Sequence, residues 1–115
     1  MGTFEGTFNE FYQWADARTR FWITAKTRKQ RRRVGTCPKC GNERALTAAH
    51  VTPRKRVVRA ALGVEDDEAL LRLNLDEAWT KIRDAHRPFD KVFRYLCGEC
   101  HLLEDQAAAK SAESA

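Results

Sequence analysis

Long apolar runs are absent from this 115-residue sequence, and no positively charged leader opens it. A membrane helix needs roughly 20 consecutive apolar residues, and no segment approaches that length. The N-terminal stretch MGTFEGTFNEF carries acids where a secretory signal would carry positive charge and a long apolar run. We therefore expect neither membrane association nor export, which places the protein in the cytoplasm.

The chain is also short and has few cysteines, four in all. This length fits one compact domain, residues 1–115, and folding removes only about two-thirds of its surface from water. The hydrophobic core is then thin, and a metal or a covalent cross-link would help to stabilise it. In a reducing compartment, cysteines paired at short spacing are metal ligands more often than disulfides.

Acidic residues are almost missing from one stretch of the chain. Between Arg18 and Arg59 there are 14 basic side chains and a single acid, Glu43, although the formal charge of the whole chain is only +5. A phosphodiester backbone binds such a cluster through counterion release, so we expect a nucleic acid, most simply DNA, as the partner. A solvated arm or another anionic surface is the alternative. The cations expected to contact nucleic acid are Lys26, Arg28, Lys29, Arg31, Arg32, Arg33, Arg54, Lys55 and Arg56.

Seven of the eleven aromatic residues lie in the first 22 positions. At 100° per residue Phe4, Phe8 and Phe11 fall on one face, which predicts an N-terminal amphipathic helix over residues 4–29. We expect this face to cover a small zinc-stabilised core; contact with a partner protein or a second copy of the chain is the alternative. The basic arm, residues 26–33, continues from this helix.

The remainder alternates strand and helix patterns. Residues 44–51 and 91–96 are expected to be strands, separated by a helical insertion over residues 57–89 that breaks at Asn74 or Asp76. A last helix opens at the second cysteine pair and fades into a disordered tail, residues 106–115. His86, near the end of the insertion, is expected to cap a helix or to face solvent. The predicted class is α+β, mostly helical.

The four cysteines form two C-x-x-C pairs, and this is the strongest signal in the sequence. Each pair can present two thiolates to one tetrahedral zinc, and two pairs complete the four ligands. The glycines in and after the pairs suit tight turns. We expect one structural zinc bound by Cys37, Cys40, Cys97 and Cys100; four free or redox-active thiols are the alternative.

A zinc with four thiolate ligands has no open position, so any catalysis must use other residues. His50 ends the first predicted strand, and His101 follows the last cysteine. If one zinc joins both cysteine pairs, these two histidines are brought near each other. One imidazole could then act as a general base on water while the other holds a divalent cation at a scissile phosphate. Ordinary polar roles beside a zinc site are the alternative.

The order C-x-x-C, A-A-H-V-x-P-R and L-C-x-x-C-H, over residues 36–105, resembles the HNH endonucleases. These are ββα-metal nucleases whose zinc-containing members have a treble-clef scaffold. The resemblance implies that His50 is the general base and that His101 binds the catalytic ion, Mg²⁺ or another divalent cation. It also implies that the four cysteines bind the structural zinc. Most of the helical insertion, residues 57–89, has no counterpart in the family.

Two positions depart from the family pattern. Ala49 stands where the family usually has an acidic or histidine metal ligand, and Val92 stands where it has the asparagine that braces the loop of the base. Asp90 lies two residues away and is a tentative replacement ligand or brace; an exposed loop acid is the alternative.

Two functions follow from these observations. The first is a small HNH-type DNA endonuclease with structural zinc and a catalytic divalent ion. The second is a treble-clef zinc protein that has lost the catalytic metal site and binds DNA or a partner protein. The feature that separates them is the pair of departures from the family pattern.

Overall fold

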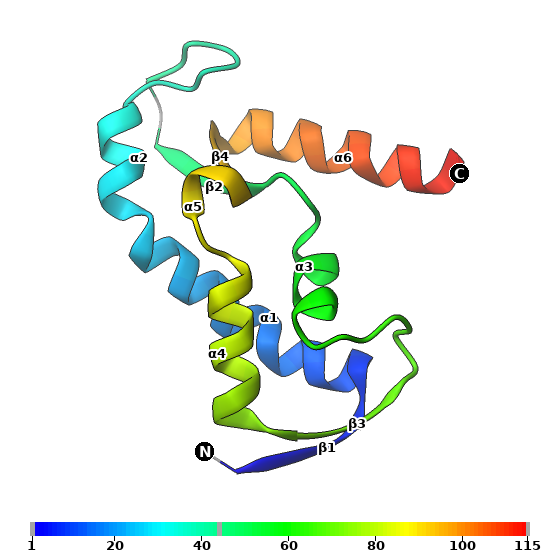
Figure 1. Ribbon diagram of the computed structural model, residues 1–115. Coiled ribbons are helices and arrows are strands. Elements are labelled where there is room, and N and C mark those ends of the chain that lie inside the picture. Colours follow the sequence, from blue (N-terminus) through cyan, green and yellow to red (C-terminus); the bar gives the residue numbers. More distant parts are fainter. Residues whose placement is uncertain (1, 44, 115) are drawn as a thin grey trace.

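The computed structural model describes residues 2–43 and 45–114, with side chains described as far as residue 107. This part of the chain is α+β and mostly helical, as the sequence predicts, and it holds two separate two-stranded sheets (Figure 1). In chain order the elements are β1 (Thr3–Thr7), α1 (Phe8–Lys26), α2 (Arg28–Val34), β2 (Leu46–His50), α3 (Arg54–Ala61), β3 (Leu70–Asn74), α4 (Leu75–Ala85), α5 (Phe89–Val92), β4 (Phe93–Cys97) and α6 (Gly98–Ser114).

β2 and β4 form the antiparallel ribbon on which the cysteine site is built. Their register pairs Leu46 with Cys97 at one end and His50 with Phe93 at the other. The first cysteine loop precedes β2, and α6 starts directly after β4. The two predicted strands are therefore confirmed, with ends that differ by a residue or two. The ribbon places the cysteines at one end and His50 at the opposite end.

A second sheet, between β1 and β3, was not expected. The predicted helix start at Phe4 was wrong, because residues 3–7 are extended and pair antiparallel with β3. The helix begins only after Thr7, whose side chain accepts from the backbone of Glu10 while the Glu10 carboxylate accepts from the Thr7 backbone. This capping box satisfies backbone donors that a helix start leaves unpaired. Residues 70–74 were predicted to be part of the helical insertion, and this was also wrong. They form β3, and their burial alternates from residue to residue as it does in a strand.

Two hydrophobic clusters share α1. Its first half, with Phe8, Phe11 and Ala15, packs in a cluster with Val58, Ala78 and Ile82 of the insertion. Its last turns contribute Ile23 to a cluster that also contains the buried cysteines and the inner faces of β2 and β4. α1 runs diagonally between these two parts of the molecule (Figure 1). This one helix therefore determines how the insertion sits against the cysteine ribbon.

The N-terminal aromatic residues do not cover the zinc core as expected. Phe8 and Phe11 are fully buried, but against the insertion rather than the cysteine ribbon. Only Trp22, near the end of the helix, reaches the other cluster, where its ring also contacts Trp79 and Phe89. Of the seven N-terminal aromatic residues, Phe21 is the exposed one, at 80%. Most of these aromatic side chains therefore pack against other residues of the same chain and are not free to contact a partner.

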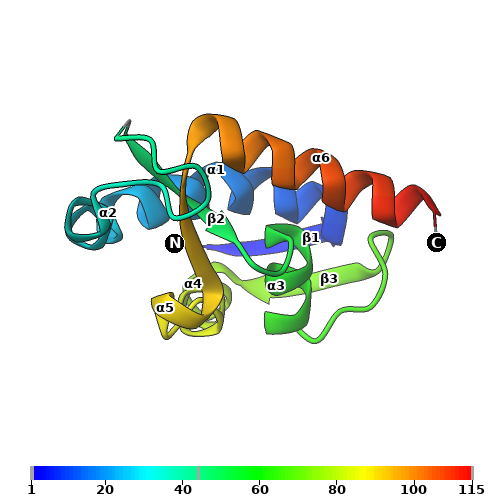
Figure 2. The same ribbon diagram turned by 90° about the horizontal axis from the view of Figure 1, so that it is seen from above.

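The C-terminal helix is longer than expected. α6 continues through the predicted disordered tail as far as Ser114, and it crosses above α1 in the view from above (Figure 2). The final residue, Ala115, lies outside the described part of the chain. Among the described helices, none is both long enough and apolar enough to span a bilayer.

Candidate functional site

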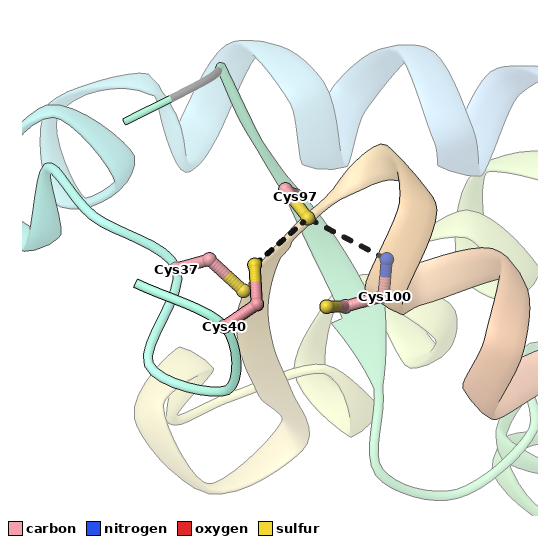
Figure 3. Close-up of side chains that lie close together, drawn as sticks. All are labelled: Cys37, Cys40, Cys97 and Cys100. Atoms are coloured by element: carbon pink, nitrogen blue, oxygen red, sulfur yellow. Dashed lines mark hydrogen bonds between the residues drawn. The ribbon is translucent and has the colours of Figure 1, made fainter. Parts of the chain in front are cut away.

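The four cysteines come together at one end of the ribbon. Cys37 and Cys40 lie in the loop before β2, Cys97 ends β4, and Cys100 lies in the first turn of α6. Their four Sγ atoms all lie within 4.8 Å of one another and point inward from the three segments (Figure 3). A loop, the end of a strand and the start of a helix thus converge on one point, as one shared metal requires.

The sulfur geometry fits a tetrahedral metal and not a disulfide. Cys40 Sγ and Cys97 Sγ are 3.7 Å apart. Zn–S bonds of about 2.3 Å in a tetrahedron separate the sulfurs by about 3.8 Å, whereas a disulfide needs about 2.05 Å. The four cysteines are therefore close enough together to hold a metal ion such as zinc.

The thiol environments also favour a cation. Backbone hydrogen bonds, that from Cys97 first, lower the pKa of the Cys37 thiol to about 6 against the effect of desolvation. Burial, followed by the neighbouring thiols, raises the pKa of Cys100 to about 12. Four adjacent thiols cannot all ionise at neutral pH without a positive charge among them, and a divalent metal supplies it.

His50, at the far end of β2, contacts a different histidine from the one expected. Its Nε2 lies 3.1 Å from Nε2 of His86, and its ring packs edge-on against Phe93. His86 is the C-cap residue of α4, so a capping position is confirmed, but its ring is fully buried rather than exposed to solvent. His86 is therefore part of the candidate site, a role the sequence reasoning missed.

Both rings are neutral at pH 7. Burial first, and then the positive charges of His86, Arg54 and His101, lower the pKa of His50 to about 3, with Asp16 opposing them. Burial and Arg54 lower the pKa of His86, against the hydrogen bond to the Ile82 carbonyl. Desolvation disfavours the charged imidazolium, and two such cations in contact would repel each other.

His50 opens onto a hollow of about 740 Å³ between β2, α3 and α6. Arg54 and Lys55, from the start of α3, and Asp105, from α6, line the same hollow. Arg54 Nε donates to Asp16 Oδ1 at 2.7 Å, and this ion pair holds its guanidinium beside the histidine. Lys39 and Glu104, which form an ion pair with each other, also line it, so the hollow combines an uncharged imidazole with three cations and two carboxylates.

His101 faces Asp105, which lies one helical turn later, rather than His50. Thr47 donates its single hydroxyl hydrogen to the Leu96 carbonyl, so its Oγ1 accepts from Nδ1 of His101 at 2.7 Å. In the neutral imidazole this leaves Nε2 with a lone pair, and Nε2 lies 3.5 Å from Asp105 Oδ2. Two acceptors facing each other form a favourable position for a cation.

The other nominated site residues lie elsewhere. Ala49 is 3% exposed within the cysteine-side cluster, so no ligand replaces the expected one at that position. Asp90 is exposed on α5, where its charge acts on Tyr95. The carbonyl of Val92 accepts from the backbone N–H of Val51, which ties the loop after His50 to the end of α5. Among the described side chains, the cysteine quartet is the one group of three or more ligating residues close enough to share a metal.

The nine nominated cations divide between two parts of the surface. Arg31 donates to the carbonyls of Thr24 and Leu46, so it braces α2 against α1 and β2. The α3 cations Arg54 and Lys55 are in ion pairs. The exposed remainder consists of Lys26 at the end of α1, Arg28, Lys29, Arg32 and Arg33 on α2, and Arg56 on α3. α2 and α3 lie apart in both views (Figures 1 and 2), so the cations form two surfaces rather than one arm.

Comparisons with family models, curated proteins and solved structures found no significant match to this chain.

Several site residues lacked a clear signal in the sequence. Asp105 is four residues after His101, a spacing that places both on one helix face, and this spacing could have revealed it. His86 and Asp16 had no such signal, because they reach the site from α4 and α1 through tertiary packing.

We expect the purified chain to contain one zinc per molecule. Chelation should lower its thermal midpoint reversibly, because zinc binding contributes about 10 to 16 kcal/mol in small modules of this kind. Cobalt substitution should give the absorption of a tetrahedral tetrathiolate. In Cys97→Ser, metal content and the chelator response should both fall. Equal zinc content and stability in this variant and the wild type would contradict the site.

Acid should destabilise the fold through His50. The unfolded chain binds a proton at this residue near pH 6.5, whereas the folded state does not until about pH 3. The free energy of unfolding therefore falls as the pH drops below 6.5, by about 2 kcal/mol between pH 7 and pH 5. Above pH 6.5 His50 is neutral in both states, so it does not destabilise the fold there. Urea unfolding of zinc-loaded wild type and His50→Gln measures it, since metal loss affects both alike. If the unfolding free energies of the two proteins changed with pH in the same way, the lowered pKa of His50 would be contradicted.

Proposed function

We propose that the chain is a metal-dependent endonuclease of the HNH type that hydrolyses phosphodiester bonds in DNA in the reducing cytoplasm, on a treble-clef scaffold stabilised by zinc. The observation that carries the proposal is the hollow that His50, Arg54 and Asp105 line together at the end of the β2–β4 ribbon. These residues supply a base, a cation for a phosphate and a carboxylate for a metal. The motif order that resembles the HNH nucleases supports the same assignment.

His50 is the proposed general base. Burial keeps the ring unprotonated at neutral pH, so a lone pair is available to accept a proton from water. A phosphate bound in the hollow would raise the pKa of His50 toward the range in which a general base works best, because a nearby negative charge favours the imidazolium. The water oxygen then attacks phosphorus, the bond to the leaving oxygen breaks, and the leaving oxygen takes its proton from solvent. Because the ring packs against Phe93 and contacts His86, its orientation is set before substrate binds.

His101 and Asp105 are the residues that would hold the catalytic divalent ion. A neutral imidazole nitrogen and a carboxylate oxygen are suitable donors for Mg²⁺ or Mn²⁺, which commonly use one or two protein carboxylates and take their other ligands from water and phosphate. The bound ion would neutralise charge on the phosphate and on the leaving oxygen. Asp105 thus compensates for Ala49, at a position on α6 rather than on β2.

Arg54 and Lys55 are the proposed phosphate contacts within the hollow. Arg54 is held by Asp16, and Lys55 by Asp67, so both cations are in place without loss of side-chain freedom on binding. The exposed cations of α2 lie on a separate surface and would contact the DNA backbone away from the cut.

The alternative is a zinc protein that binds DNA or a partner without cutting. It is supported by the buried Ala49 and by the absence, among described side chains other than the cysteines, of three clustered metal ligands. The α2 surface would then be the functional part of the molecule.

Nicking of supercoiled plasmid by zinc-loaded protein with Mg²⁺ or Mn²⁺ separates the two functions. We expect His50→Ala to lower the nicking rate by about 10²- to 10⁴-fold, the usual contribution of a general base. Asp105→Asn should raise the metal concentration needed for half-maximal rate. Asp84→Asn, which removes an exposed acid of α4, is the matched control and should leave both quantities unchanged. Intact plasmid across metals, with DNA binding retained, would establish the alternative.

Replacing the exposed arginines of α2 should weaken DNA binding for all sequences alike. In the triple variant Arg28→Gln, Arg32→Gln, Arg33→Gln, the slope of log affinity against log salt should become shallower by about 0.9 for each lost phosphate contact. Arg31 is left intact because its hydrogen bonds stabilise the fold. Arg72→Gln, an arginine exposed on β3, is the control. A slope equal to that of the control would show that α2 does not touch phosphate.

A further inference from the structure

Three groups form a continuous line of hydrogen bonds from α4 to the end of β2. The carbonyl of Ile82 lies 2.7 Å from Nδ1 of His86. Nε2 of His86 lies 3.1 Å from Nε2 of His50. Each link is within hydrogen-bonding distance, so the hydrogens on the two rings are determined by the one group in the line whose role is fixed.

That group is the Ile82 carbonyl, which can only accept. Nδ1 of His86 must therefore carry a hydrogen and donate it. A neutral imidazole has one N–H, so Nε2 of His86 has a lone pair and must accept. This assigns His86 to the Nδ1–H tautomer.

The assignment passes to His50 through the contact between the two rings. Because Nε2 of His86 accepts, Nε2 of His50 must donate and carry the hydrogen of that ring. Nδ1 of neutral His50 is then left with the lone pair. Both rings stay neutral because they are buried and because Arg54 adds positive charge nearby, with Asp16 as the opposing acid at His50.

Packing prevents the line from rearranging. His86 is fully buried, with its ring stacked on Phe93 and edge-on to Trp22. The ring of His50 packs edge-on against both His86 and Phe93. A ring flip of His86 would place carbon against the Ile82 carbonyl and leave a buried acceptor unpaired, which costs about 1 to 3 kcal/mol.

We propose that His86 is the positioning residue of the site: it fixes His50 as the Nε2–H tautomer and so presents Nδ1 as the atom that takes the proton from water. The catalytic part of this inference rests on the proposed nuclease function; the tautomers do not. When Nδ1 accepts the proton, the imidazolium keeps donating from Nε2 to the bare Nε2 of His86, which stabilises the new charge. His86 acts only through His50 and contacts no substrate.

Nitrogen-15 NMR of the zinc-loaded full chain at pH 7 tests the tautomers directly. Two-bond couplings from the ring protons distinguish protonated from bare nitrogens, and His50→Gln and His86→Gln assign the two rings. The expected result is a hydrogen on Nδ1 of His86 and on Nε2 of His50. A hydrogen on Nε2 of His86, or on Nδ1 of His50, would overturn the inference.

Two substitutions at position 86 then separate positioning from packing. His86→Phe keeps a buried aromatic ring but offers no acceptor, so His50 should become a mixture of tautomers and the nicking rate should fall about tenfold or more. His86→Gln can present its Oε1 to Nε2 of His50, and should retain the His50 tautomer and most of the rate. An unchanged His50 tautomer in His86→Phe would overturn the inference. If that variant does not fold, the wild-type spectrum and His86→Gln decide it.

The same measurements distinguish the two proposals. If the wild type shows the expected tautomers but does not nick DNA, the positioning of His50 stands and the nuclease proposal fails. If it nicks DNA while His50 carries its hydrogen on Nδ1, the nuclease proposal stands and His86 does not position the base.

Discussion

The convergence of four sulfurs at one end of the β2–β4 ribbon is the constraint on which the arrangement of the site depends. Two strands alone are marginal in water, and this ribbon has no third strand beside it among the described residues. A metal held by the loop before β2, the end of β4 and the first turn of α6 would lock the register and the direction of the helix together. His50 at the far end of β2 and His101 on α6 then have defined positions relative to each other.

The insertion between β2 and β4 supplies what the ribbon lacks. It packs against the first half of α1, and the second half of the same helix packs against the ribbon. Trp22 contacts Trp79 and His86 of the insertion and also packs against the cluster on the ribbon side. The insertion therefore does more than lengthen a loop, because through His86 it brings a buried acceptor to His50. The cation of the hollow, Arg54, comes instead from the A-A-H-V-x-P-R motif, before the insertion begins.

Charge has two separate roles in this chain. Arg31 and Arg54 belong to the same basic stretch as Arg32 and Arg33, but the first two are bound within the molecule. Arg31 satisfies backbone carbonyls and Arg54 is paired with a carboxylate, whereas the last two are exposed on α2. A count of basic residues overstates the cations available to a partner, because the guanidinium of Arg31 uses its donors to join helices and a strand. Arg54 differs from Arg31, because it lines the hollow while Asp16 holds it in place.

Local patterns were enough to predict the cysteine cluster, the two strands of the ribbon and the class of the fold. These features depend on short-range spacing: two residues between cysteines, alternating apolar positions, and a glycine or proline at a turn. The strand at residues 3–7 could be identified only from the tertiary structure, because it depends on pairing with residues 70–74 far along the chain. The tertiary structure likewise decided that His50 contacts His86 and that His101 faces Asp105. Which atoms meet across a core is a property of packing between distant segments, and no local pattern encodes it.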